Sequence, residues 1–147
     1  MYDEAIVKDL AACGLNCARC VKYFNGSTKR LSTELLAMLE GYDKVAERLS
    51  TFDETLKNYP TFKEMLQWFS AGDCHGCRNG ASGFPGCLAK TCHREKGVTF
   101  CFECDEYPCN RNNYNPELDA KWKAINNRIK EIGIEAYYQE QAKLPRY

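Results

Sequence analysis

The sequence lacks any long apolar run and any excess of charge of one sign. No stretch approaches the roughly 20 apolar residues of a membrane-spanning helix, so we expect no membrane association. Lysine plus arginine and aspartate plus glutamate both number 20, which gives a formal net charge of zero. Because non-specific nucleic-acid binding depends on a surplus of basic residues, nucleic acid is not an expected partner.

The sequence also lacks the features of a secretory signal peptide. It begins Met-Tyr-Asp-Glu-Ala-Ile, with acidic residues where a signal peptide needs a basic start, and no sufficiently long apolar segment follows. We therefore expect a cytoplasmic protein whose thiols stay reduced.

Cysteine is the residue type that the sequence has in abundance, with 10 in 147 residues. The cysteines form four clusters: Cys13, Cys17 and Cys20; Cys74 and Cys77; Cys87 and Cys92; Cys101, Cys104 and Cys109. Three pairs have the spacing Cys-x2-Cys, which lets both sulfurs point at one cation, and two such pairs complete a tetrahedron. Because disulfide scaffolds belong to oxidising compartments and mostly to shorter chains, we predict that these ten cysteines are metal ligands and that the metal is zinc.

The spacing favours one particular division of the cysteines between two zinc ions. Cys74, Cys77, Cys101 and Cys104 resemble the two paired turns of a zinc ribbon and would hold the first ion. Cys17 and Cys20 would hold the second ion with two of Cys13, Cys87, Cys92 and Cys109. Ten sulfurs exceed the eight that two tetrahedral sites need, so either two cysteines are bystanders or one site is a cluster with more metal.

The remaining sequence predicts a mainly α fold, with a small α+β arrangement as the alternative. Apolar residues recur with helical period over 32–50, where Gly41 can interrupt the helix. A second helix is expected to begin near Thr61, where Thr61 and Glu64 have the spacing of a capping box and Phe62, Met65, Leu66 and Phe69 share one face.

The last third is predicted to be helical, with Asn115 as N-cap, Pro116 in the first turn and Gly133 before a final helix over 134–144. The cysteine-rich region between the helical parts holds at most a brief strand over 98–102, and Arg78 to Gly86 is expected to be a connector. No linker is evident, so we expect a single domain over 1–147.

Polar residues beside the cysteines have two interpretations. His75 and His93 could replace a sulfur as ligands, although with ten cysteines a hydrogen-bonding or solvent-exposed role is expected. Glu103, Asp105 and Glu106 are expected to lie on a solvated loop rather than to act as general acids. Basic residues scattered among the cysteines are expected to offset thiolate charge: Arg19, Lys22, Arg78, Lys90, Arg94 and Lys96.

Taken together, residues 13–20 (CGLNCARC), 74–78 (CHGCR) and 101–109 (CFECDEYPC) resemble the successive signatures of a cysteine-rich family of bacteria and archaea that is known only as a domain of unknown function. Residues 96–98 and 132–135 extend the resemblance over nearly the whole chain. It implies presumed zinc binding and a prokaryotic source, and it implies no established reaction.

Cys13, Cys17 and Cys20 also have the spacing that holds the iron–sulfur cluster of radical S-adenosylmethionine enzymes. Those enzymes place the motif after the first strand of a large partial barrel, which this chain is too short and too helical to form. The bacterial ferredoxin pattern is absent as well. Iron–sulfur ligation in another arrangement stays open, because all-thiolate sites accept either zinc or clusters.

Three functions are compatible with these patterns. The favoured one is a structural zinc domain that presents a surface to a protein partner, because full cysteine coordination leaves no open metal position for catalysis. The alternatives are an iron–sulfur redox protein or enzyme and a thiol or metal sensor in which spare cysteines change state. No catalytic residue is predicted.

Overall fold

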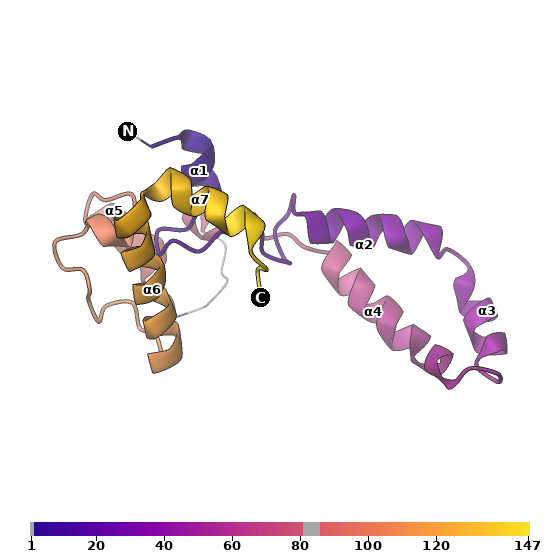
Figure 1. Ribbon diagram of the computed structural model, residues 1–147. Helices are drawn as coiled ribbons and strands as arrows, with labels where there is room; N and C mark the ends of the chain where they lie inside the picture. The colour runs from indigo at the N-terminus through magenta and orange to yellow at the C-terminus, as the bar shows by residue number, and fades with distance from the viewer. Residues whose placement is uncertain (1, 81–85) are drawn as a thin grey trace. The chain divides into compact units, whose positions relative to one another are not determined.

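A computed structural model describes residues 2–80 and 86–147 (Figure 1). The chain is mainly helical, as predicted, and its contacts divide it into two compact units. The smaller unit is Cys20–Asp73, and the larger unit comprises Met1–Arg19 and Cys74–Tyr147. The single cooperative domain expected from the sequence stays a prediction, and the connector expected over 78–86 lies largely outside the described residues.

The smaller unit is a helical hairpin. It contains helices α2 (Ser27–Met38), α3 (Tyr42–Leu49) and α4 (Tyr59–Ser70), with the 3₁₀ helix η1 (Glu54–Asn58) before α4. Helices α2 and α4 pack side by side and run in opposite directions (Figure 1). Gly41 separates α2 from α3 with a φ of 79°, a left-handed conformation that glycine adopts without steric cost. The predicted interruption at Gly41 is therefore confirmed.

The start of α4 differs from the prediction. The helix begins at Tyr59 with Pro60 in its first turn, so Thr61 lies inside the helix and does not cap it. Pro60 suits this position because a first-turn residue needs no hydrogen-bonded N–H. The predicted apolar face is only partly covered, because Leu66 is buried whereas Phe62 and Met65 are 44% and 48% exposed.

The larger unit contains four α-helices: α1 (Glu4–Asp9), α5 (Ala89–Glu95), α6 (Pro116–Ile132) and α7 (Ile134–Lys143). Asn115 caps α6, since its side chain accepts a hydrogen bond from the Leu118 N–H at 2.9 Å. Gly133, with a φ of 83°, separates α6 from α7. These features of the last third are confirmed as predicted.

The brief strand predicted over 98–102 is wrong. Cys101–Glu103 forms a 3₁₀ turn, η3, and the Glu103 carboxylate accepts hydrogen bonds from the N–H groups of Thr99 and Phe100 at 2.8 and 2.7 Å. A side chain thus takes the backbone donors that a partner strand would have used. Glu103 also accepts a hydrogen bond from the Tyr2 hydroxyl, so it has a structural role rather than that of a freely solvated loop residue.

The larger unit has two neighbouring apolar clusters. The first is hydrocarbon and aromatic, and its buried members are Ile6, Leu10, Phe100, Ile129, Ile134 and Tyr137. The second is built on Ala11, Cys13, Ala89 and Trp122, and five further cysteines pack against it. These six cysteines therefore belong to the core of this unit. No helix in the described ranges is both long and apolar enough to cross a membrane.

Candidate metal centre

The first cysteine loop, which carries Cys13 and Gly14, packs against helix α6 and is hydrogen-bonded to helices α6 and α7. Gly14 crosses α6 so closely that a Cβ there would lie 2.4 Å from Ile125, and its φ of 87° also excludes a larger residue. The buried Asn126 amide donates to the Cys13 carbonyl at 3.0 Å, and the Tyr137 hydroxyl donates to the Gly14 carbonyl at 3.2 Å. These contacts hold Cys13 in place without any metal.

Four cysteines from distant parts of the chain meet beside this loop, and we call them the first set: Cys13, Cys17, Cys77 and Cys87. Cys13, Cys77 and Cys87 line a common cavity, and the Cys17 and Cys77 thiols are hydrogen-bonded to each other. The Cys87 sulfur lies 3.1 Å from the Tyr114 hydroxyl. The first set thus contains two cysteines that precede the smaller unit in the sequence and two that follow it.

The surroundings of the first set favour protonated thiols. Burial raises the pKa of Cys13 to about 11. The hydrogen bond with the Cys77 thiol, followed by burial, raises the pKa of Cys17. Burial acts because a thiolate would lose its hydration, and the hydrogen bond acts because the Cys17 thiol must keep its proton to donate to Cys77. A positive ion bound between the sulfurs would reverse this preference.

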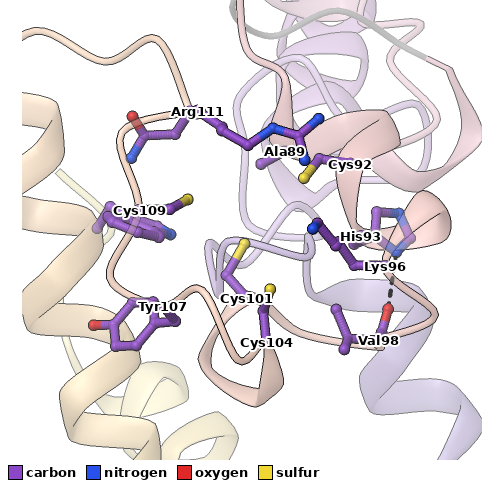
Figure 2. A pocket seen from close by; sticks show the side chains of 12 residues that line it. Ala89, Cys92, His93, Lys96, Val98, Cys101, Cys104, Tyr107, Cys109 and Arg111 are labelled. Atoms are coloured by element: carbon purple, nitrogen blue, oxygen red, sulfur yellow. Dashed lines mark hydrogen bonds between the residues drawn. The ribbon is translucent and has the colours of Figure 1, made fainter.

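The remaining cysteines of the last two clusters form the second set: Cys92, Cys101, Cys104 and Cys109. All four line one cavity, of about 30 Å³, and Figure 2 shows their side chains around it. Cys92 comes from helix α5, Cys101 from η3, and Cys104 and Cys109 from the turn that follows. Burial is the first cause that raises the pKa of Cys101, to about 12. Burial likewise raises the pKa of Cys92.

Two basic side chains lie at the edge of the second set. Arg111 and Lys96 line the same cavity and are labelled beside the sulfurs in Figure 2. Lys96 forms an ion pair with Glu106, and Arg111 lies 3.4 Å from a Glu95 carboxylate oxygen. The charge of Arg111 lowers the pKa of Cys92, against the effect of burial. These bases are placed to offset negative charge on the sulfurs.

Three side chains connect the two sets. Trp122 and His93 each line a cavity of the first set and the cavity of the second set. Arg78 donates hydrogen bonds to the Leu10 and Thr99 carbonyls, both at 2.7 Å. Burial lowers the pKa of Arg78, while Cys13, Cys17 and Cys101 act in the opposite direction. Arg78 therefore is one of the six predicted bases whose charge acts on the cysteines.

His93 is buried, and His75 is exposed. The His93 Nδ1 lies 3.3 Å from the Val98 carbonyl oxygen, and its buried Nε2 has no hydrogen-bond partner in the described part of the chain. Burial lowers the pKa of His93, so the neutral ring is favoured. A backbone carbonyl on one ring nitrogen is the arrangement by which proteins orient an imidazole toward a metal.

The structure divides the cysteines differently from the spacing argument. Cys77 belongs to the first set, whereas Cys101 and Cys104 belong to the second, so three of the four ligands assigned to one ion line two different cavities. Cys20 falls in the smaller unit, and Cys74 lines none of the cavities of either set. The described geometry thus groups eight of the ten predicted ligands.

Within residues 2–80 and 86–147, no group of three or more His, Cys, Asp or Glu side chains is arranged as the ligands of a single metal ion. Three members of the first set and all four of the second line a cavity, and Cys17 lies next to Cys77. Sequence patterns also missed the neighbours Tyr114 and Arg111, since neither belongs to a recognisable motif, although Arg111 follows Cys109 by two positions.

Comparison with known proteins gives a family and no function. No curated protein and no solved structure matches the chain. A family model described as "Protein of unknown function (DUF3795)" matches residues 9–114. This range contains all ten cysteines and covers well over half of the chain. The chain therefore belongs to the DUF3795 family of proteins of unknown function.

Proposed function

We propose that this protein binds metal through its two cysteine sets and that the metal, zinc in the first instance, stabilises the larger unit. The observation that supports this most directly is the grouping of eight cysteines, from segments far apart in sequence, into two sets of four, the second of which is drawn in Figure 2. Four thiolates are the usual complement of a structural zinc site. Zinc supplies a doubly positive charge, and the chain supplies the sulfurs and their orientation.

A bound cation would change the protonation state of the buried thiols. Cys13 and Cys101 are buried deeply enough that their pKa values rise to about 11 and about 12. Without a cation the neutral thiols are favoured, whereas a cation bound between them would favour the thiolates that ligate it. Metal binding turns this arrangement into a source of folding free energy, because the unfolded chain offers no preformed site.

An iron–sulfur cluster in the second set is the second candidate, and a specific observation favours it. The four sulfurs of the second set line a cavity, and the described residues show no group of ligands for a single ion. In a four-iron cluster each cysteine binds a different iron atom, so the ligand sulfurs lie farther apart than around one zinc ion. Arg111 and Lys96 would then lie beside a negatively charged cluster.

The deciding experiment is elemental analysis with an absorption spectrum on protein purified without oxygen, repeated on single serine variants. The proposal expects about four thiolates per zinc centre, hence about two zinc ions per chain and no visible absorption. Iron with acid-labile sulfide and a broad visible band would establish the cluster candidate instead. Protein that is well folded and free of both metals would contradict metal binding altogether.

The serine variants test the division of ligands. Cys101→Ser and Cys104→Ser should each lower the metal content by one centre and lower the melting temperature. Cys20→Ser and Cys74→Ser are matched controls, because these cysteines lie outside both sets, and they should keep full metal content. Equal metal loss in Cys74→Ser and Cys101→Ser would instead support the division expected from spacing.

We also propose that a protein partner binds the smaller unit. Its helices leave several large apolar side chains in solvent, including Met38 at 81%, Phe52 at 87% and Trp68 at 48% exposure. Apolar side chains grouped on one small unit are typical of protein-binding surfaces. Loss of a co-purifying protein in a Phe52→Ser, Met38→Ser double variant, with the helix content unchanged, would support this role.

A further inference from the structure

A second kind of site lies on the outer side of the first cysteine set. Its inner part is a cavity of about 200 Å³ with an almost wholly apolar lining. The floor is formed by the Cys13, Cys77 and Cys87 side chains, and helix α6 forms a wall with Leu118, Trp122 and Ile125. A cavity of this kind suits the hydrocarbon or aromatic part of a small molecule.

The mouth of this cavity continues into a more polar groove of about 390 Å³. Leu15, Lys121 and Ile125 line both spaces, so the two are adjacent. The groove is bounded by the end of the chain, with Arg146 and Tyr147 on one side and helix α6 on the other. A molecule with an apolar body in the inner cavity would thus place its other end near Lys121 and Arg146.

The charges in the groove favour an anionic end. Arg128 is balanced by Glu140 and Glu131, each at 2.8 Å. Lys121 and Arg146 form no ion pair with any residue in the described ranges, although both line the groove. Lys121 and Arg146 are thus two cations that the ion pairs of the described residues leave available, and a carboxylate at the mouth would be attracted to both.

We propose that this protein binds a small carboxylate with an apolar body in the cleft between helix α6 and the first cysteine loop. The apolar body occupies the inner cavity against Trp122, and the carboxylate accepts hydrogen bonds from Lys121 and Arg146. The ligand class follows from the residues that line the cleft, which are mostly apolar in the inner cavity and include two cations in the groove. This inference does not depend on which metal the cysteines bind.

The test uses 1-naphthoate as the anionic probe and 1-naphthalenemethanol as the neutral probe of similar shape. Both are titrated into the full-length Trp68→Phe protein, in which Trp122 is the remaining tryptophan and lies on the cavity. Quenching of Trp122 by naphthoate with saturation, at a Kd at least tenfold lower than that of the alcohol, is expected. Equal affinity for the two probes, or no saturable binding at millimolar concentration, would overturn the proposal.

Variants then test the cationic mouth. Lys121→Gln and Arg146→Gln should each weaken naphthoate binding about three- to tenfold and leave binding of the alcohol unchanged. Lys123→Gln is the matched control, because it lies on the same helix but pairs with Asp119 and lines neither space. Equal weakening by Lys121→Gln and Lys123→Gln would contradict the assigned contacts.

One further outcome separates this site from the metal centre. Naphthoate affinity is measured before and after the protein is loaded with zinc, with zinc content checked on the same sample. Binding that persists in the loaded protein supports a separate ligand site. Loss of naphthoate binding in proportion to bound zinc would show that the cavity is the metal position itself and would overturn the proposal.

Discussion

At the scale of single residues, Asn126 shows how polar contacts position the cysteines. It is fully buried, and its side-chain amide donates to the carbonyls of Cys13 and Trp122 at 3.0 and 2.9 Å. It thereby ties the first cysteine loop to helix α6. Neither helical periodicity nor cysteine spacing identifies such a residue, since the contact joins positions more than a hundred residues apart.

We predict that Asn126→Ala lowers the free energy of unfolding by about 1–3 kcal/mol, because the Cys13 carbonyl is left buried without a donor. Chemical denaturation followed by circular dichroism measures the change. Gln139→Ala, at an exposed position of helix α7, is the control and should stay within about 0.5 kcal/mol of the parent. Similar effects of the two substitutions would show that the buried hydrogen bonds contribute little.

Tyr138 gives a prediction about alkaline pH. Its hydroxyl donates to the Asp9 carboxylate at 2.6 Å, and this bond is the first cause that raises the pKa of Tyr138 to about 12. The unfolded tyrosine loses its proton near pH 10, so the unfolded state binds fewer protons between pH 10 and 12 and is favoured as the pH rises. The stabilisation from Tyr138 should be constant below pH 10 and shrink above it.

The measurement is the difference in the free energy of unfolding between the parent and Tyr138→Phe at several pH values. Subtracting the variant removes the contribution of the cysteines, which also titrate in alkaline solution. A difference that stays constant from pH 8 to pH 11.5 would contradict the assigned hydrogen bond.

At the scale of elements, the helices were predictable where their signals are local. Asn115, Pro116 and Gly133 mark the ends of helices α6 and α7 within a few residues, and the structure confirms them. The start of α4 was misplaced because Pro60 is compatible with a first turn, so Thr61 was not needed as a cap. The strand over 98–102 was wrong because Glu103 bonds its own backbone, which an alternation of residue types does not reveal.

Gly41 offers a test of the joint between α2 and α3. A Cβ at this position would meet nothing within 4 Å, so a substitution acts only through the left-handed backbone, with its φ of 79°. We predict that Gly41→Ala costs about 1–2 kcal/mol and that Gly41→Asn costs less, because asparagine tolerates this conformation better. Thermal denaturation should rank the proteins in the order glycine, asparagine, alanine. An alanine variant as stable as the parent would contradict this backbone assignment.

At the scale of the whole molecule, the cysteine sets show the limit of spacing arguments. A pair such as Cys74 and Cys77 is recognisable because its members are near each other in sequence. Cys17 is hydrogen-bonded to Cys77, and Cys92 lines the same cavity as Cys109. Both relationships depend on how helices and turns pack around Trp122, so they have no local signature in the sequence. The abundance of cysteine was therefore evident from the sequence, whereas the arrangement of the cysteine side chains around the cavities was not, and metal binding stays a prediction.

The two compact units allow a test of the single-domain prediction. The chain has two tryptophans, Trp68 in the smaller unit and Trp122 in the core of the larger one. In the Trp68→Phe variant, fluorescence reports the larger unit alone, and far-UV circular dichroism reports helices of both. A single cooperative domain predicts coincident denaturation curves. A circular dichroism transition that is separated from the fluorescence transition would show that the units unfold independently.

The insertion of the smaller unit between Arg19 and Cys74 has a consequence for synthesis on the ribosome. Cys13 and Cys17 leave the exit tunnel before the hairpin of α2 and α4 is made, whereas their partner Cys77 follows 60 positions after Cys17. At roughly 5–20 residues per second, the early thiols wait about 3–12 s for it. The nascent chain thus passes through a stage in which Cys13 and Cys17 are outside the ribosome and Cys77 is not. During this stage their thiols are accessible to oxidants and to other metal ions. A supply of reductant during translation should therefore raise the yield of correctly folded protein.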